Sequence, residues 1–571
     1  MKLFKYLTLS MLLAGTLSLH AAIERTHAPR EPIEQYHKAE WNVQLTADWE
    51  DPYRTPDVSL DMEIRAPSGR ELVLPCFYVS GESGALSRWQ ARFAPMEPGG
   101  YRYRFVLHDD AAADSSTAWQ SFSAAVSDEP GFLRLNNRWS FRYDNGKPFR
   151  GVGENLGWEA RAHDDSKFFK GLHEDPRFNY DDMLAALHAN EGTFFRTWMI
   201  YWNLPVDWKI VHNTYRYEDT EARFNPSGIE RLDHLVELAD RFDVHFMLTL
   251  ESHVGLLGDG WERSTYNARN GGWAETPAEF FTDAETRSHY KDKLRYMIAR
   301  WGYSPSIAVW ELFNEVDNAM YPGHQEQTIP DAAVRDWHRE MSAYLKAHDP
   351  YGHLVSTSVS HREVKGLYDV ETLDFCQKHM YRATAAIPEA LRQDADHFDK
   401  PCVIGEFSRE WDWSKNFDDM YGEMQGDFRR GLWYGLFSPT PVLPLSWWWE
   451  YFDAHGDTAY FAHVQEINRH MLQAGLGSFV ELDLQVAQPL QVLGVRCGEL
   501  RYVYVFNQGD ESLPLTVEGL RNGACTVDLY DCAEGTYRAL GPQQVGSGRL
   551  QLSSEALAPG ADVVLILHPA R

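Results

Sequence analysis

The sequence predicts a multidomain chain in which a central (β/α)8 TIM barrel lies between an N-terminal and a C-terminal antiparallel β-sandwich domain. Its 571 residues are about twice the number that one hydrophobic core normally holds. Both ends alternate polar and apolar residues in short runs, whereas the middle alternates apolar runs with helical text. Hydrophobic residues make up 44% of the chain and charged residues 24%, which is typical of folded proteins.

Residues 1–22 have the features of a cleaved secretion signal. Lys2 and Lys5 precede the apolar run 7–19, and the small residues Ala21 and Ala22 follow it. We therefore expect export to the periplasm or the extracellular space, with a buried N-terminal helix as the alternative. No later segment reaches the roughly 20 apolar residues of a bilayer span, so no membrane span is expected.

Residues 23–128 are expected to form the N-terminal sandwich. From Trp41 to Ser127, short alternating runs are separated by turn sequences such as residues 67–69 and 98–100. Period-two alternation with frequent turns indicates antiparallel strands. No carboxylate cluster occurs here, so a packing or sugar-binding role is expected for this accessory domain.

Residues 129–475 are expected to form the barrel. Helical text, for example residues 230–242 and 332–348, separates eight short apolar runs. Eight strands that alternate with helices are the number that closes a parallel barrel. The runs occupy residues 148–155, 192–199, 244–253, 307–315, 354–360, 373–381, 401–407 and 444–450.

Residues 476–571 return to alternation and are expected to form the C-terminal sandwich. Six cysteines in an exported chain permit disulfides but do not make a dense framework. Cys525 and Cys532 are close enough in sequence to pair, whereas Cys376 and Cys402 lie in apolar runs and could equally be buried thiols. The pairing stays open.

Charge and motifs exclude several classes of partner. The formal net charge is −29 and no basic tract occurs, so nucleic acid is not an expected partner. The sequence contains no zinc-protease, phosphate-loop or serine-hydrolase motif. The acidic residues 394–399 lack the glycine of a calcium loop, so a solvated surface segment is the better interpretation. No cofactor or metal is therefore expected.

Candidate site residues follow from the predicted barrel, because barrel enzymes place their sites at the carboxyl ends of the strands. Glu315 ends the fourth run and Glu406 the seventh, and three strand–helix units of about 30 residues fit between them. A pair of carboxylates about 5–5.5 Å apart serves retaining cleavage of glycosidic bonds. Other run ends carry Glu154, Arg196, Glu251, His253, Asn314, His379, Tyr381, Trp447 and Trp448.

In order and spacing, these residues resemble the clan A glycoside hydrolases of the family 5 type. The resemblance covers the middle domain, and the flanking sandwiches resemble accessory domains of such barrels. It implies that Glu315 is the general acid and base and that Glu406 is the nucleophile. Val316 follows Glu315 where the family often has proline, which leaves the exact family open.

The chemistry of these roles sets requirements on the surroundings. The acid must hold a proton near neutral pH, and the nucleophile must stay ionised, which a neighbouring cation favours. Arg196 could supply that cation, or it could simply neutralise a buried carboxylate such as Glu311. The resemblance implies that Asn314 binds the sugar 2-hydroxyl, a contact that strengthens in the transition state.

The remaining candidates would bind or orient the sugar. Tyr381 is expected to hold Glu406 in line, and His379 to touch the sugar or orient a neighbour. Trp447, slightly preferred over Trp448, would form the flat floor of the subsite where cleavage occurs. Rim residues that could either bind sugar hydroxyls or be structural are Glu154, Trp158, Glu251 and His253.

The sequence thus predicts an exported retaining glycoside hydrolase that acts on a poly- or oligosaccharide and needs no cofactor. A non-catalytic carbohydrate-binding or surface-adhesion protein on a barrel scaffold is the alternative. A transglycosylase with the same two carboxylates is a third possibility. The sugar and its linkage, endo or exo action, and the oligomeric state stay open.

Overall fold

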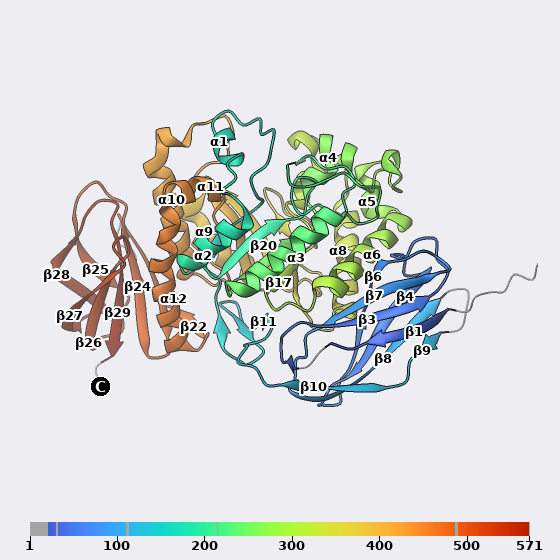
Figure 1. The fold of residues 1–571 in the computed structure, drawn as a ribbon. Helices are drawn as coiled ribbons and strands as arrows, with labels where there is room; N and C mark the ends of the chain where they lie inside the picture. The colour runs from blue at the N-terminus through green and yellow to red at the C-terminus, as the bar shows by residue number, and fades with distance from the viewer. Residues whose placement is uncertain (1–20, 30–31, 110–113, 214, 486–488, 570–571) are drawn as a thin grey trace, which may run out of the picture.

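The computed structural model describes residues 21–29, 32–109, 114–213, 215–485 and 489–569. The expected signal peptide, residues 1–22, lies almost wholly outside these ranges. Along the described chain, mostly antiparallel strands come first, parallel strands and helices follow, and antiparallel strands return (Figure 1).

Two sheets form the N-terminal region. In β3, Trp41, Val43 and Leu45 are buried and the residues between them are partly exposed, the period of a strand with one face on a core. One sheet has the order β1 (Ala22–His27), β3 (Ala39–Thr46), β7 (Leu86–Phe93), β6 (Phe77–Ser80). The other has the order β2 (Ile33–Glu34), β10 (Gln120–Ala125), β8 (Gly99–Asp109), β4 (Val58–Arg65), β5 (Glu71–Pro75), and β9 (Ser115–Ser116) pairs with β8.

Parallel strands form the barrel in the middle of the chain. One sheet has the order β14 (Gly153–Asn155), β15 (Phe194–Trp198), β16 (His245–Thr249), β17 (Ile307–Glu311), β18 (Leu354–Ser356). After one intervening residue, another continues with β19 (Ser358–Val359), β20 (Cys376–Tyr381), β21 (Cys402–Ser408). Parallel bridges from Ser446 to Phe407 and to Glu154 join the last strand to the first. The eighth predicted run is therefore present as bridges rather than as a full strand.

Every residue of β15, β16 and β17 is buried, as expected for parallel strands that are covered on both faces. A small sheet of β11 (Leu133–Leu135), β12 (Phe141–Tyr143) and β13 (Pro148–Phe149) covers the N-terminal end of the barrel. Its residues Phe141 and Phe149 pack in one core with Phe194 and Val403 of the barrel strands. The small sheet does not cover the C-terminal end of the barrel strands, where a functional site can lie.

The helices follow the strands in alternation. Asn225 caps α3 by accepting hydrogen bonds from two backbone N–H groups, and Pro226 occupies its first turn. The long helices are α2 (Tyr180–Ala189), α3 (Pro226–Arg241), α6 (Ala284–Trp301), α8 (Asp331–His348), α9 (Ile387–Phe398), α10 (Tyr421–Leu436) and α12 (Phe461–Gly475). Short helices in the loops are α1 (Lys170–His173), α4 (Gly258–Arg263), α5 (Pro277–Thr282), α7 (Val316–Met320) and α11 (Trp449–Ala454).

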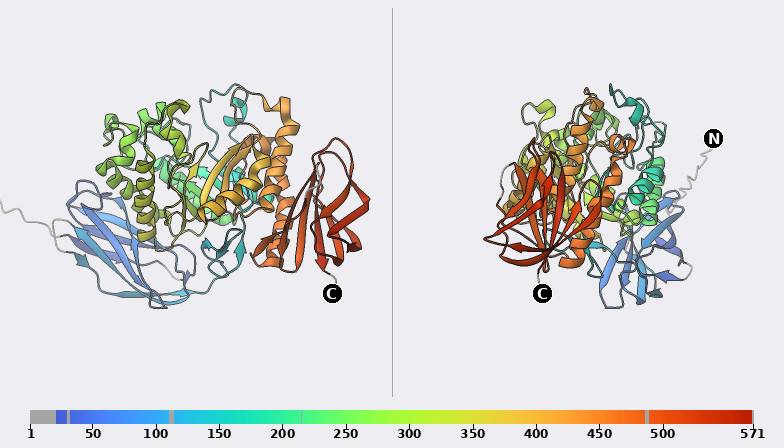
Figure 2. Two further views of the ribbon diagram at one scale, coloured as in Figure 1. Left: turned by 180° about the vertical axis from the view of Figure 1, so that it is seen from behind. Right: turned by 90° about the vertical axis from the view of Figure 1, so that its left-hand side faces the viewer.

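The C-terminal region again consists of two sheets that share one apolar core. The larger has the order β22 (Phe479–Glu481), β23 (Leu490–Cys497), β24 (Leu500–Asn507), β29 (Asp562–Pro569), β26 (Gly523–Asp531), β27 (Thr536–Val545). The smaller pairs β25 (Leu513–Glu518) with β28 (Arg549–Leu557). Figure 2 shows this region against α12 at one side of the barrel and the N-terminal region at the other.

Cysteines 376 and 402 form a disulfide between the neighbouring strands β20 and β21. Cys525 and Cys532 are both free and buried, so the pair that is close in sequence is not the pair that forms. None of the helices in the described ranges combines the length and apolar character needed to cross a membrane.

Candidate active site

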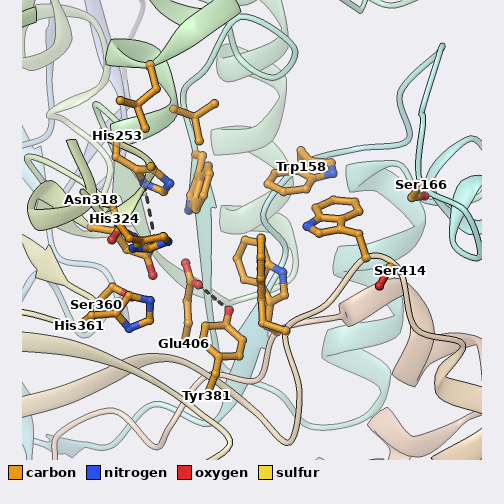
Figure 3. Close-up of a pocket in the computed structure, with 18 of the residues that line it drawn as sticks. Trp158, Ser166, His253, Asn318, His324, Ser360, His361, Tyr381, Glu406 and Ser414 are labelled. Carbon is orange, nitrogen blue, oxygen red and sulfur yellow. Dashed lines mark hydrogen bonds and ion pairs between the residues drawn. The ribbon is translucent and has the colours of Figure 1, made fainter. Parts of the chain in front are cut away.

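A cavity of about 930 Å³ opens where the parallel strands end (Figure 3). Its lining includes Glu315 after β17, Tyr381 at the end of β20, Glu406 on β21 and Trp447 after the last bridge. This volume is at the upper end of the range for small-molecule sites, which suits an oligosaccharide better than a single sugar.

The two predicted carboxylates meet at this cavity. Nδ1 of His379 lies 2.8 Å from Oε1 of Glu315 and 3.4 Å from Oε2 of Glu406. One ligand atom from each of these three side chains lies within 4.8 Å of the others. These oxygens of the two carboxylates are closer together than the roughly 6.5–9.5 Å between the carboxyl groups of inverting enzymes.

Arg196 lies fully buried beneath the pair and contacts two carboxylates. Its Nη1 donates to Oε1 of Glu406 at 2.7 Å, and its Nε and Nη2 donate to Glu311 at 2.6 and 2.9 Å. Burial disfavours the guanidinium charge, but Glu311 and Glu406 outweigh burial and raise the pKa of Arg196. Arg196 therefore both places a cation against Glu406 and neutralises the buried Glu311.

Glu406 is held from the other side by Tyr381, whose hydroxyl donates to Oε2 at 2.7 Å. Burial raises the pKa of Glu406, while the charges of His379 and Arg196 and the Tyr381 hydrogen bond act against that rise without cancelling it. The hydroxyl and the guanidinium thus favour the ionised carboxylate that an attack on carbon requires.

Glu315 has an unusual backbone conformation, with φ 48° and ψ 52° in the left-handed region, directly before α7. Its backbone N–H donates to Oγ of Ser358 at 2.9 Å, and Nδ2 of Asn318, one turn later, donates to its Oε2 at 2.9 Å. Ser360 also hydrogen-bonds to the carboxylate. Three side chains therefore fix this carboxylate when His379 is included.

The neighbouring Asp317 is fully buried and binds the loop after β19. It accepts hydrogen bonds from the backbone N–H groups of Ser360, His361 and Arg362 at 2.8, 3.0 and 3.0 Å. These contacts place Ser360 against Glu315 and His361 at the rim of the cavity.

The electrostatics at Glu315 differ from the expectation for a proton-holding acid. Burial raises its pKa, but the hydrogen bond and charge of His379 and the charge of His253 outweigh burial, and the pKa is lowered. The buried Nε2 of His379 has no hydrogen-bond partner in the described part of the chain.

Asn314 and His253 lie next to Glu315 and contact each other. Asn314 is fully buried and accepts from Nη2 of Arg196 at 2.6 Å. The backbone N–H of His253 donates to the Asn314 carbonyl at 3.2 Å, and the His253 ring lines the cavity 3.7 Å from Oε2 of Glu315. His253 is thus placed as expected, whereas Asn314 supports the floor from below.

Trp447 and Trp158 line the cavity, but Trp448 does not. Trp448 has φ 68°, and this left-handed turn sends its ring away from Trp447, where its Nε1 donates to the Glu410 carbonyl at 2.9 Å. Trp448 is therefore removed from the substrate-binding set.

Glu154 is also outside the cavity, because side chains alternate along a strand. Asn155 points inward and accepts from Arg196 at 3.1 Å, so Glu154 points outward into a separate cavity of about 210 Å³ with Arg177 and Asp453. Burial, followed by the charges of Asp453 and Glu450, raises the pKa of Glu154 well above its ordinary value. Glu154 is a structural acid here.

Glu251 likewise faces the protein interior. Its Oε1 lies 2.5 Å from Nζ of the fully buried Lys293, which also contacts Asp207 at 2.9 Å. Burial raises the pKa of Glu251 to about 7 despite the lysine.

Several lining residues were not found from the sequence. Asn318 could have been found, since it lies three positions after Glu315 at the start of a helix, and so could Trp198, since it ends strand β15. Most of the remaining residues lie on loops. The lining residues not found are Arg161, Trp198, Trp202, Asn318, Tyr321, His324, Ser360 and His361.

The spacing of Glu315, His379 and Glu406 alone would admit a metal ion. However, Nδ1 of His379 already contacts Glu315, and the Arg196 guanidinium lies 2.7 Å from Glu406. A fixed cation against one of the three groups disfavours a second one, so proton chemistry fits this donor set better than metal binding.

The sequence is similar to known proteins over parts of its length. Residues 32–108 match a family described as a domain of unknown function, DUF5060. Mannan endo-1,4-beta-mannosidase A of Podospora anserina is 24% identical over 217 residues, which are 34% of this chain and 54% of that protein. Mannan endo-1,4-beta-mannosidase F of Aspergillus fumigatus is 28% identical over 138 residues, 24% of this chain and 28% of that protein. The matches therefore span about half of these relatives or less.

Solved structures share the fold at low identity. A Bacteroides vulgatus protein described as a candidate glycoside hydrolase aligns with 95% of this chain and 100% of its own, with a TM-score of 0.63 and 14% identity. A glycoside hydrolase family 5 structure from the same species covers 77% of this chain and 94% of its own, with a TM-score of 0.50 and 14% identity. The predicted resemblance to family 5-type barrels is confirmed by these similarities.

Proposed function

We propose that this chain, whose barrel resembles family 5 glycoside hydrolases, is a retaining glycoside hydrolase that acts on a poly- or oligosaccharide. The observation that carries the proposal is the approach of Glu315 and Glu406 to within 4.8 Å in a cavity large enough for several sugars. The relatives named as mannan-degrading enzymes make β-1,4-mannan the first substrate to test.

In the first step, Glu406 attacks the anomeric carbon and forms a glycosyl–enzyme ester, while Glu315 gives its proton to the departing glycosidic oxygen. Arg196 and Tyr381 keep the nucleophile ionised and aligned until the new bond forms. In the second step, Glu315, now a carboxylate, takes a proton from water as that water attacks the same carbon. The Glu406 carboxylate leaves, and the anomeric configuration is retained.

The buried side chains beneath the two carboxylates support the proposed reaction without contacting the reacting atoms. Asn314 and Arg196 are buried under the carboxylates, so any contact of Asn314 with a sugar hydroxyl needs a small movement on binding. Trp447 offers an apolar face next to Glu406 for the sugar at the cleavage point. We also propose export through residues 1–22 and accessory roles for residues 23–128 and 476–571.

Hydrolysis of a polysaccharide panel tests the proposal. Wild-type protein, Glu406→Gln and Glu315→Gln are compared for release of reducing ends from mannan, xylan, cellulose and acidic polymers. Both substitutions should lower turnover by at least about 10³-fold, because each removes a group that acts in the reacting complex. The exposed Glu389→Gln on α9 is the matched control and should retain wild-type rates.

Activity of both active-site variants within a few fold of wild type would contradict the assignment. Binding of one polymer by all four proteins, with release of reducing ends by none, would favour the carbohydrate-binding alternative. For an active enzyme, proton NMR of the first product distinguishes retention from inversion.

A further inference from the structure

We propose that the cavity receives its substrate by the non-reducing end and releases units from chain ends. The inference rests on the proposed function, since it takes Glu406 as nucleophile and Glu315 as acid. In that chemistry the leaving sugar, which carries the reducing end, lies on the side of the acid, and the glycone lies on the other side. Figure 3 shows Asn318, Ser360 and His361 on one side of Glu406, and Trp158 and Ser414 on the other.

The glycone side is narrowed by a packed group of side chains, which we call the end wall: Trp158, Arg161, Asp164, His173 and Trp413. The exposed Lys167, Trp411 and Ser414 line the cavity next to this wall. The ring of Trp158 stands at 75° to that of Trp447, with centroids 5.5 Å apart. It is wedged edge-on against Trp198, Trp202 and Trp449 as well. A ring upright at the edge of the proposed floor limits how far a sugar chain can continue past it.

Arg161 fills the space beside that ring. Its guanidinium lies 5.0 Å from the Trp158 ring and 5.5 Å from the Trp413 ring, distances at which a cation is held by aromatic faces. Asp164, whose side chain has no exposure, accepts two hydrogen bonds from it at 2.9 and 2.6 Å and contacts His173 at 3.0 Å. The guanidinium of Arg161 is thus held by two aromatic rings and by the Asp164 carboxylate.

The two loops that carry the end wall are packed together. The loop after β14 places Phe169 against Phe417 and Trp448, with ring centroids 4.7 and 5.0 Å apart. His173 from the same loop packs edge-on against Trp413 at 5.2 Å. Since Phe169, His173 and Phe417 are buried, moving either loop aside would expose apolar surface.

The side of the cavity next to the proposed acid Glu315 differs, because exposed side chains form its rim. His324 and His361 at the rim are both exposed, and their rings lie 5.7 Å apart. A sugar chain leaving past Glu315 therefore meets surface side chains rather than a packed wall. A cavity that is narrowed by a packed wall beyond the nucleophile and bordered by surface side chains beyond the acid fits a chain end.

Binding to inactive protein tests this without needing turnover. The Glu406→Gln protein is titrated calorimetrically with β-1,4-linked hexasaccharides of mannose, glucose and xylose in three forms: unmodified, carrying a fluorophore at the reducing end, or carrying a benzyl ether on the non-reducing sugar. The reducing-end group should change Kd by less than about threefold, and the non-reducing cap should weaken binding at least about tenfold. Equal binding of both modified forms would overturn the inference.

Products supply the second test. From the reducing-end-labelled hexasaccharide, wild type should first release labelled fragments shortened by one fixed length. Arg161→Ala should give a wider range of labelled fragments, whereas the matched Arg177→Ala, on the same loop but outside this cavity, should keep the wild-type pattern. Labelled fragments of every length from wild type at the earliest times would reject the inference while leaving the hydrolase assignment standing.

Discussion

At the scale of single residues, the site is organised as two carboxylates with different supports. Glu406 is held by a hydroxyl and a guanidinium, and Glu315 by an amide, a hydroxyl and an imidazole. Both sets lie on rigid strand ends or directly after them, which is how a fold keeps reacting groups within a fraction of an ångström of their working positions.

Tyr381→Phe should reduce kcat/KM about 10- to 100-fold, the effect of losing one hydrogen bond to a charged group. The Tyr381 hydrogen bond lowers the pKa of Glu406, so its loss raises that pKa. Because Glu406, as the proposed nucleophile, must be ionised to attack, the acidic limb of the pH profile should move to higher pH. A lower rate with an unmoved acidic limb would argue against a direct contact in solution.

Asp317→Asn should lower kcat about 10²-fold without removing any group that touches substrate. The carboxylate accepts three backbone N–H groups, and an amide in its place would turn an NH₂ toward one or two of them. The loop with Ser360 would shift, and small misplacements at a reacting group have effects of this size. The basic limb of the pH profile should move as well, which general destabilisation would not cause; Asp331→Asn on α8 is the control.

At the scale of elements, the sequence predicted the barrel order well because buried parallel strands are short and apolar throughout. The eighth run was predicted as a strand but makes only bridges, since Pro441 and Pro444 have no N–H to donate to a ladder. The ends of the apolar runs correctly predicted that Glu315 and Glu406 lie at the cavity. They did not predict that the side chains of Glu154 and Trp448 point away from it. The end wall consists of loop residues, and no periodicity in a sequence places those.

Glu154→Gln should change how stability depends on pH. The folded pKa of Glu154 is raised, so its contribution is fully present below about pH 4.3 and is lost as the pH rises through the folded value. Glutamine does not ionise, and the variant should therefore lose less stability than wild type between pH 5 and 8. Melting temperatures across this range give the comparison, with the exposed Glu50→Gln as control. Parallel curves for Glu154→Gln and wild type would show that this carboxyl is not buried as described.

At the scale of the whole molecule, the N-terminal region and the barrel are joined by paired charges and by aromatic rings packed edge-on. Arg295 of α6 donates to Asp61 of β4 at 2.6 Å, and Arg54 donates to Asp292 at 2.8 Å. The Tyr53 ring packs edge-on against Tyr296 of the barrel at 5.6 Å. These contacts predict that the two regions unfold together.

Asp61→Ala should lower the free energy of unfolding by about 3 kcal/mol, because it leaves a mostly buried arginine without its partner. Calorimetry should show one transition for the N-terminal region and the barrel, and it should move as a whole. Glu63→Ala, which breaks the more exposed pair with Arg104, should change the free energy of unfolding much less than Asp61→Ala does. Two separated transitions, with only the first moved by Asp61→Ala, would mean that the regions are independent.

The left-handed backbone of Glu315 makes this position a conflict between durability and catalysis. A residue with a Cβ in that conformation raises the energy of the folded state by roughly 1–2 kcal/mol, and glycine would not. In a lineage that ceased to need the proposed acid, Glu315→Gly would remove this strain in a single nucleotide change, since GAA or GAG becomes GGA or GGG. It would also remove the hydrogen bonds that the carboxylate accepts from Asn318 and His379. Glycine or asparagine at this position in a relative would therefore indicate that the proposed reaction has been lost there.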